Sequence, residues 1–213
     1  MSDLRGGALL AETLHALGVR DIFTLHGGHL DPFLVACPGV GIQLIDVRHE
    51  ASAGHAAEAY AMMRPGEVGV CVVTAGPGFT NVLTAMASAY ANAVPTLFIV
   101  GAPPMGEEAT NELQGGINQV AMAMPVAKWA HRISVIERLP DQVEKAMRLA
   151  LSGRPGPVFL EVPINVMFGT AGKVFFPVEP GRPQAARPTI SRPDADRLLD
   201  ALAAAERPIV MGG

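Results

Sequence analysis

The sequence predicts an α/β protein with a doubly wound, mainly parallel six-stranded sheet and helices on both faces. Six short runs rich in Val, Ile and Leu alternate with segments of helical periodicity. Several of the runs are continuously apolar, which indicates strands buried on both faces. Hydrophobic residues make up 49% of the chain and aromatic residues only 5%. The core must therefore be built from aliphatic side chains, which favours helices lying close on a sheet.

The first half of the chain supplies three strand–helix steps. Helical periodicity runs from about residue 7 to residue 17, and Gly18 ends it before the first strand, "DIFTL". The second strand, "GIQLIDV", precedes the helix "HEASAGHAAEAYAMM", whose small residues allow a close approach to the sheet. The third strand, "VGVCVVT", leads through the turn "AGPGFTN" into the helix "VLTAMASAYANA".

The second half completes the sheet and then changes character. The strands "PTLFIVG", "VAKWAHRI" and "PVFLEVP" are joined in part by the helix "LPDQVEKAMRLALSG". Prolines then recur from Pro177 to Pro193, which is typical of a surface linker. We therefore expect one domain over residues 1–170, a linker over 171–192, and over 193–213 a helix and the first strand of a truncated central domain. The chain is expected to be a piece of a longer protein.

Charge and cysteine usage exclude several classes of protein. The net charge is −4 and Lys and Arg are scattered, which argues against a nucleic-acid partner. The uncharged stretch over residues 68–106 is repeatedly interrupted by Gly, Pro and Asn, so we expect no membrane span. Cys37 and Cys71 have no CxxC spacing and are interpreted as small buried hydrophobes in a reducing cytoplasm.

Chemically useful side chains follow the strands of the predicted sheet. Ligands of open parallel sheets bind at the carboxyl ends of the strands, and here those ends read "LHGGH", "DVRHEA", "VTAGPGFTN" and "VGAPP". Glu50 stands between His49 and an alanine-rich helix. The residues of that helix's first turn carry no charge that could screen the carboxylate of Glu50. Its alternative role is that of an acid interacting with the helix dipole.

Other sites of known type fit the sequence poorly. "AGPGFTN" has Asn81 where a dinucleotide fingerprint has its third glycine, and no P-loop or GxSxG motif occurs. The spacing of His26 and His29 does not match a zinc site, so no metal ligand is predicted. His55 is interpreted as a packed helix residue. His29 remains as a titratable group at a strand end.

Four motifs together resemble one enzyme family. "RHEASAGHAAEAYA", "VTAGPGFTN", "GAPP" and "GRPGPVFLEVP" occur in the order and spacing of the N-terminal, pyrimidine-binding domain of thiamine diphosphate enzymes. The chain resembles the group of acetolactate synthase, benzaldehyde lyase and 2-hydroxyacyl-CoA lyase. Acetolactate synthases commonly read Tyr-Pro-Gly-Gly where this chain has "LHGG". The stretch "LHGGH" and the later segment "TNELQGGINQVAMAMPVAKWAHR" are more similar to the corresponding segments of benzaldehyde lyase.

The resemblance implies roles for individual residues. The acid matching Glu50 hydrogen-bonds N1′ of the aminopyrimidine and so promotes loss of the thiazolium C2 proton. His29 would relay a proton of the substrate, with Gln114 as its hydrogen-bonding companion. The residues expected to line the pyrimidine side are Gly27, Gly28, Thr74, Pro77 and Asn81, although such a turn also serves simple helix–sheet packing. Phe79 could face either the substrate or the core.

The same resemblance implies an activity and partners for the complete protein. It would cleave or form C–C bonds of 2-hydroxyketones, aldehydes or 2-oxoacids, as a homodimer or homotetramer with active sites between subunits. A C-terminal domain absent from this chain would hold Mg²⁺ and the diphosphate, and FAD, found in some relatives, would sit largely in the central domain. This chain alone should be inactive. The alternatives are an acetolactate synthase acting on pyruvate and, for the isolated piece, a non-catalytic dimerisation module.

Overall fold

The computed structural model describes residues 4–107, 114, 116–174, 177–184 and 189–211. Its centre is a six-stranded sheet with the order β3-β2-β4-β5-β7-β6, in which every neighbouring pair is parallel. The strands are β2 (Asp21–Thr24), β3 (Gln43–Asp46), β4 (Gly69–Val73), β5 (Thr96–Ala102), β6 (Trp129–Arg132) and β7 (Val158–Pro163). The predicted parallel, doubly wound sheet is confirmed.

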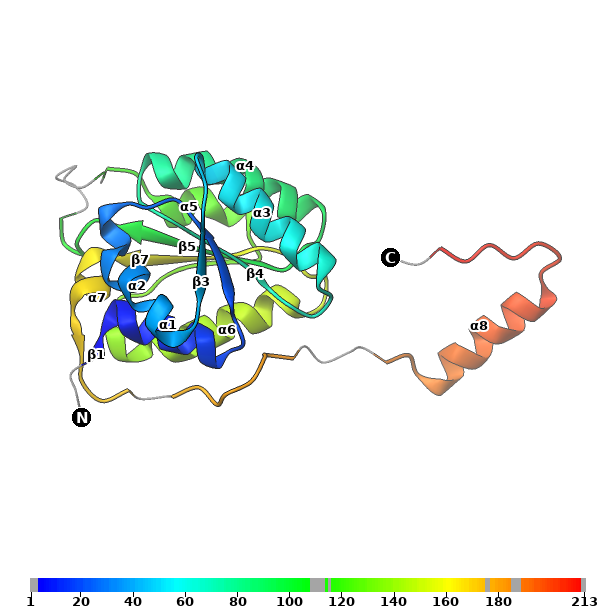
Figure 1. The fold of residues 1–213 in the computed structure, drawn as a ribbon. Coiled ribbons are helices and arrows are strands. Elements are labelled where there is room, and N and C mark those ends of the chain that lie inside the picture. The colour runs from blue at the N-terminus through cyan, green and yellow to red at the C-terminus, as the bar shows by residue number, and fades with distance from the viewer. Residues whose placement is uncertain (1–3, 108–113, 115, 175–176, 185–188, 212–213) are drawn as a thin grey trace.

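Helices cover both faces of this sheet (Figure 1). One face carries α1 (Gly6–Ala16), α2 (Asp31–Ala36), α6 (Leu139–Leu151) and α7 (Ile164–Phe168), and the other carries α3 (Glu50–Met63), α4 (Pro77–Ala91) and α5 (Gln119–Ala123). Short 3₁₀ turns lie between them: η1 (Gly28–Leu30), η2 (Pro38–Val40), η5 (Met124–Val126) and η6 (Ile136–Arg138). A two-residue antiparallel pair, β1 (Leu4–Arg5) with β8 (Thr170–Ala171), was not predicted.

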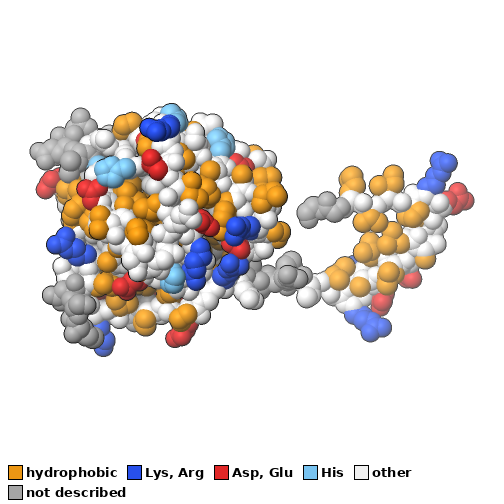
Figure 2. Space-filling view, in the orientation of Figure 1, with side chains coloured by type: hydrophobic (Ala, Val, Ile, Leu, Met, Phe, Trp, Pro, Cys, Tyr) orange, Lys and Arg blue, Asp and Glu red, His pale blue; other side chains and the backbone are white. Residues whose placement is uncertain are grey.

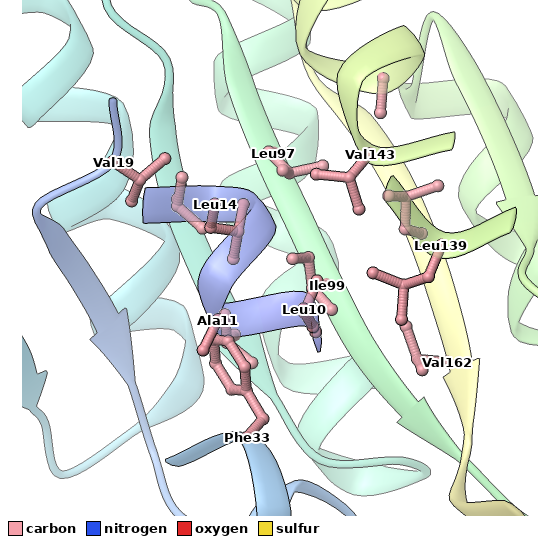
Figure 3. Packing of buried hydrophobic residues seen from close by; sticks show 14 of the residues in the cluster. Leu10, Ala11, Leu14, Val19, Phe33, Leu97, Ile99, Leu139, Val143 and Val162 are labelled. Carbon is pink, nitrogen blue, oxygen red and sulfur yellow. The ribbon is translucent and has the colours of Figure 1, made fainter. Parts of the chain in front are cut away.

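The core consists of two apolar layers, one on each face of the sheet. In β5, Leu97 and Ile99 join the layer under α1 and α6 (Figure 3), whereas Phe98 and Val100 join the layer under α3 and α4. All four are fully buried. Burying such a side chain stabilises the fold by about 1.5–3 kcal/mol. Because successive strand residues face opposite layers, continuously apolar runs are what a central parallel strand requires.

Small residues bring α3 close to the sheet and to α4. A Cβ added at Gly54 would lie 2.9 Å from Cγ2 of Val82 on α4, so the two helices could not approach as closely with any larger residue. The alanine-rich composition of α3 therefore has a packing role. It sets the distance between the N-termini of α3 and α4, where the candidate site lies.

Gly69→Ala is expected to destabilise the chain by about 1–3 kcal/mol, because overpacking forces the backbone to shift. A Cβ at Gly69, in central strand β4, would overlap the backbone carbonyl of Ala57 and lie 2.7 Å from its carbon. Urea unfolding followed by circular dichroism measures the change. Gly39→Ala is the matched control, since a Cβ at Gly39 meets no atom within 4 Å. Equal midpoints for the two variants would contradict the packing argument.

The C-terminal segment is attached to the domain at one end and stands apart from it at the other. Gly181 N donates to the carbonyl of Ala16 at 2.8 Å, and Arg182 pairs with Glu67 at 2.9 Å. Helix α8 (Arg192–Ala204) is capped by Ser191, whose Oγ accepts from Asp194 N at 3.3 Å.

Helix α8 lies away from the α/β domain (Figure 1), and its apolar side chains, including those of Leu198 and Leu199, are exposed (Figure 2). The strand expected after it is not formed over residues 208–211. A β-strand needs a neighbour for its backbone hydrogen bonds, and the described residues offer none there.

Both cysteines are buried free thiols, as predicted. Desolvation raises the pKa of Cys37 to about 12 and also raises the pKa of Cys71. Both thiols are therefore protonated and inert at neutral pH. Among the residues that the structure describes, no helix is both long enough and apolar enough to cross a lipid bilayer.

Candidate active site

The candidate site lies where the order of the strands reverses. Strands β2 and β4 are neighbours in the sheet, yet β3 comes between them in the chain and lies on the other side of β2. At such a switch point the connections leave in opposite directions and open a crevice at the carboxyl ends of the strands. The loops over residues 25–30 and 74–76 meet there, and β3 leads through His49 into the N-terminus of α3.

Glu50 is the first residue of α3 and is buried, with 9% of its surface exposed. His49 caps the helix, because its Nδ1 accepts from Ala51 N at 3.2 Å. The amide of Asn81, one turn into α4, donates to Oε2 of Glu50 at 2.9 Å. Oε1 lies 3.5 Å from a Cβ added at Gly78, so it faces the glycine side of the turn. Asn81 thus holds the carboxylate of Glu50 by Oε2, and Oε1 faces the turn that contains Gly76 and Gly78.

His29 lies in η1 after β2 and is 5% exposed. Its Nδ1 lies 2.9 Å from Oγ1 of Thr74, the residue that follows β4. Gly27 makes this approach possible, since a Cβ there would lie 2.6 Å from the same hydroxyl oxygen. The contact fixes the ring plane of His29 and joins the two loops of the switch point.

The turn between β4 and α4 needs glycine at one position. Gly76 has φ +61° and ψ −117°, a conformation that side chains disfavour. Gly78 N donates to Ala75 O at 3.2 Å, and Thr80 N donates to Gly76 O at 2.9 Å. The exposed Pro77 follows as the first residue of α4. The turn therefore presents backbone and a proline ring on one side of the crevice.

The structure now gives a location to Phe79, His26 and His55. Phe79 is fully buried in the core, and its ring centroid lies 5.2 Å from that of Phe159, so it faces the core. His26 is exposed, and its Nε2 lies 2.8 Å from Oδ1 of Asp31 at the start of α2. His55 is exposed and therefore not the packed helix residue that was expected; its Nδ1 lies 3.3 Å from Oε2 of Glu58, outside the site.

Gln114 and Gly28 are the two candidate residues for which no hydrogen bond within the site is described. Gln114 is exposed with φ +65°, and its Cβ lies 2.7 Å from the position of a Cβ added at Gly76, so it lies over the turn. Gly28 is exposed, and a Cβ there would meet no atom within 4 Å. The structure thus brings Glu50, Asn81, His29 and Thr74 into two hydrogen-bonded pairs around the Gly76 turn.

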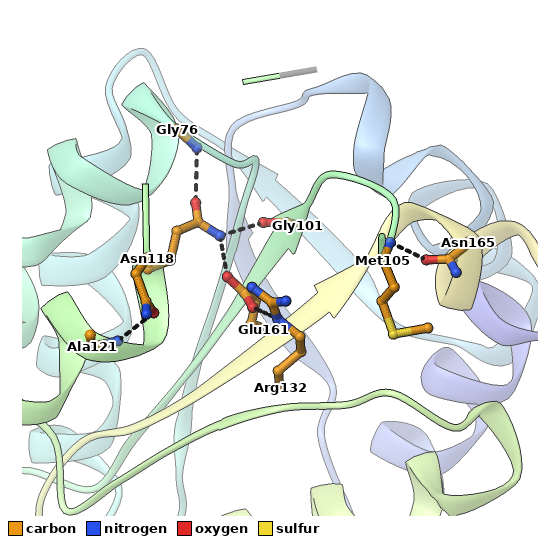
Figure 4. A network of polar contacts seen from close by, with 9 residues as sticks. Gly76, Gly101, Met105, Asn118, Ala121, Arg132, Glu161 and Asn165 are labelled. Atoms are coloured by element: carbon orange, nitrogen blue, oxygen red, sulfur yellow. Dashed lines mark hydrogen bonds and ion pairs between the residues drawn. The ribbon is translucent and has the colours of Figure 1, made fainter. Parts of the chain in front are cut away.

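Sequence reasoning missed a buried polar network beside these pairs (Figure 4). Gln119, at the start of α5, is 2% exposed, and Glu161, in β7, is 1% exposed. Gln119 Nε2 donates to Oε1 of Glu161 at 2.8 Å, and Nε of Arg132 on β6 donates to Oε2 of the same carboxylate. The sequence did contain an indication of this network, because Glu161 is the one acidic residue in the otherwise apolar run "VFLEVP". A buried carboxylate requires partners of its own.

The residues of the site fit the pyrimidine ring of a thiamine cofactor. A flat aminopyrimidine offers a ring nitrogen that forms a hydrogen bond with a carboxyl group, and Glu50 presents Oε1 for such a bond. No side chain projects from Gly78 beside that oxygen, which lies 3.5 Å from the position of a Cβ added there. The buried site also excludes water from the carboxyl group, which strengthens hydrogen bonds made there.

Comparison with known proteins agrees with this geometry. The family model described as "Thiamine pyrophosphate enzyme, N-terminal TPP binding domain" matches residues 4–122. The chain is similar to 2-hydroxyacyl-CoA lyase 2 of Danio rerio, with 42% identity over 167 residues that cover 78% of this chain and 27% of the relative. The human protein of the same name is 42% identical over 163 residues, covering 76% of this chain and 26% of the relative.

A second group of relatives consists of acetolactate synthases. The probable acetolactate synthase large subunit of Methanocaldococcus jannaschii is 33% identical over 216 residues, covering 99% of this chain and 36% of the relative. The chain thus corresponds to between a quarter and somewhat over a third of the length of these curated relatives. From the matched family model and the Glu50 site, we conclude that this chain belongs to the thiamine pyrophosphate enzymes and contains their N-terminal cofactor-binding domain.

Proposed function

We propose that this chain is the pyrimidine-binding part of a thiamine diphosphate-dependent lyase or carboligase that cleaves or forms C–C bonds next to a hydroxyl or oxo group. One observation carries the proposal. The buried Glu50 is paired with the partly buried Asn81, and the buried His29 with the partly buried Thr74, on either side of the Gly76 turn. One side suits an aminopyrimidine and the other suits proton transfer at a substrate.

Glu50 is proposed to hold the proton that it shares with N1′ of the aminopyrimidine. When bound, thiamine diphosphate supplies a carbon nucleophile that adds to carbonyl groups. Asn81 keeps the carboxyl group oriented by donating to Oε2, so Oε1 faces the ring. Gly27, Gly28 and Pro77 are proposed to border the pyrimidine. Burial removes water that would compete for this hydrogen bond.

His29 is proposed to exchange a proton with the hydroxyl oxygen of a 2-hydroxy substrate. Thr74 holds Nδ1 of the ring at 2.9 Å and so restricts its orientation. Gln114, which lies over the Gly76 turn, is proposed to bond the same substrate oxygen. An imidazole ring is suited to this step because it both accepts and donates a proton near neutral pH.

The complete enzyme is proposed to need parts outside this chain. A C-terminal domain would hold the diphosphate and Mg²⁺, and subunits would pair as a homodimer or homotetramer so that this domain faces the diphosphate site of a partner. FAD would bind, if at all, in a central domain that follows helix α8. The free thiols of Cys37 and Cys71 favour a reducing cytoplasm. On this proposal the isolated chain is inactive.

The test uses the full-length protein that contains this chain. Calorimetry with thiamine diphosphate and Mg²⁺ measures cofactor binding, and the loaded protein is assayed on benzoin, on a 2-hydroxyacyl-CoA and on pyruvate. We expect cofactor binding and faster turnover of a 2-hydroxy substrate than of pyruvate. Failure to bind the cofactor would refute the proposal.

The second candidate is an acetolactate synthase, favoured by the similarity to the archaeal relative over 99% of this chain. On that candidate, the loaded full-length protein would condense pyruvate and leave both 2-hydroxy substrates intact. The two candidates therefore differ in their products from the same set of assays.

A further inference from the structure

We propose that Gln119, Glu161 and Arg132 form a positioning network that holds the Gly76 turn and the backbone beside His29 in register for the cofactor. This inference rests on the proposed function, since it assigns these residues to the geometry of that site. None of the three would touch the reacting atoms; each acts through the backbone that it binds.

Gln119 connects the backbone of Gly76 with that of Gly101 through two of the contacts drawn as dashed lines in Figure 4. Its Oε1 accepts from Gly76 N at 2.9 Å, and its Nε2 donates to Gly101 O, near the end of β5, at 3.0 Å. Gly101 in turn lies against His29, because a Cβ added there would stand 2.6 Å from Cβ of His29. One buried amide thus fixes the distance between the glycine turn and the strand under the histidine.

Glu161 determines which way that amide points. A glutamine side chain has an acceptor end and a donor end, and either could face Gly76. Both the Glu161 carboxylate and the Gly101 carbonyl can only accept, so the NH₂ group must face them. Oε1 is then left for Gly76 N. A buried carboxylate needs a cation nearby, and Arg132 supplies it from β6.

The held turn links the two halves of the site. Two residues before Gly76, Oγ1 of Thr74 lies 2.9 Å from Nδ1 of His29. Five residues after it, Nδ2 of Asn81 donates to Oε2 of Glu50 at 2.9 Å. A shift of the turn would therefore alter both pairs together, and displacement of about 1 Å in a reacting group costs up to about 100-fold in rate.

The first test compares wild type with Gln119→Ala in the full-length protein, without cofactor. Hydrogen–deuterium exchange with fragmentation that resolves the Gly76 amide should show exchange faster by about tenfold or more. With thiamine diphosphate and Mg²⁺ added, C2 proton exchange of the bound cofactor and kcat should each fall by about 10-fold to 100-fold, with KM changed much less.

Asn118→Ala is the matched control, because Asn118 caps the same short helix by accepting from Ala121 N at 3.0 Å, whereas the bond to Gly76 N is made by Gln119. It loosens the start of α5 and should leave Gly76 exchange and kcat near wild type. Equal effects of Asn118→Ala and Gln119→Ala would assign the loss to the helix and overturn the inference.

A variant of similar length separates positioning from packing. Gln119→Met fills much the same space but can neither accept from Gly76 N nor donate to Gly101 O. We expect its Gly76 exchange and kcat to change in the same direction as in Gln119→Ala. Gly76 protection and kcat near wild type in Gln119→Met would overturn the inference, also if Gln119→Ala does not fold.

The remaining outcomes are equally decisive. Unchanged Gly76 exchange in Gln119→Ala overturns the network as a holding device, and faster exchange with unchanged kcat and C2 exchange overturns its role at the site. A wild-type protein that binds no thiamine diphosphate overturns the proposed function and with it the link to the cofactor, while the exchange measured without cofactor still decides whether Gln119 holds the turn.

Discussion

Glu50→Gln in the full-length protein is expected to slow C2 proton exchange of bound thiamine diphosphate by at least about 100-fold, the lower part of the range for a positioned acid–base group. The amide keeps the shape of the carboxyl group and can still accept from Asn81, which now binds Oε2 at 2.9 Å. It cannot share a proton with the pyrimidine nitrogen. Acid quenching after mixing in D₂O, followed by NMR of the C2 proton, measures the exchange rate.

Glu58→Gln is the control for this experiment. Glu58 is a second buried acid on α3, and its Oε1 accepts from Ser88 Oγ at 3.0 Å and from Asn92 Nδ2 at 2.8 Å. The same substitution there removes a buried carboxylate from the same helix outside the site. It should cost stability and leave C2 exchange near wild type. If Glu50→Gln exchanges as fast as Glu58→Gln, Glu50 is not the group that activates the cofactor.

His29→Ala is expected to reduce turnover of a 2-hydroxy substrate by about 100-fold to 10,000-fold, because it removes a proposed proton relay. Cofactor affinity should stay within about threefold of wild type, since the pyrimidine is assigned to Glu50 and not to His29. Steady-state kinetics gives kcat, and calorimetry with thiamine diphosphate and Mg²⁺ gives the affinity. A parallel loss of both would point to a collapsed loop instead.

His55→Ala provides the matched control, because His55 lies on α3 outside the site and pairs with Glu58 at 3.3 Å. Its turnover should remain close to that of wild type. His29→Gln adds a second test, since the amide can still bond to Thr74 but cannot carry a proton. Turnover by His29→Gln close to the wild-type rate would remove His29 from the reaction and leave it a packing role.

Local patterns in the sequence were sufficient to predict the sheet. Each of the six predicted runs forms a strand. Strands β4, β5 and β7 are buried throughout and apolar at nearly every position, as a strand covered on both faces requires, whereas the edge strands β3 and β6 are not fully buried. Helix α3 begins at Glu50, where the alanine-rich pattern starts. The short pair β1–β8 was missed, since two residues carry no periodicity. Residues 208–211, part of the stretch where the first strand of a central domain was expected, are not in a strand, because pairing depends on a neighbour and not on composition.

The candidate site was only partly readable from sequence. Glu50 and Asn81 were both singled out, but their contact joins positions 31 residues apart and depends on how α3 packs on α4. Phe79 could not be assigned from sequence, because its orientation follows from the rotation of α4 on the sheet. Gln119 was passed over in favour of Gln114, since both lie in one polar segment and only burial tells them apart.

The sequence by itself determined the type of fold, the family motifs and the buried acid at the start of α3. These depend on short-range periodicity and on residue spacing along the chain. Only the tertiary structure decided that β2 and β4 are neighbours and that one amide, Gln119, connects the turn at Gly76 to β5. The physical reason is that strand order and side-chain contacts arise from packing between segments distant in the chain, which no local pattern encodes.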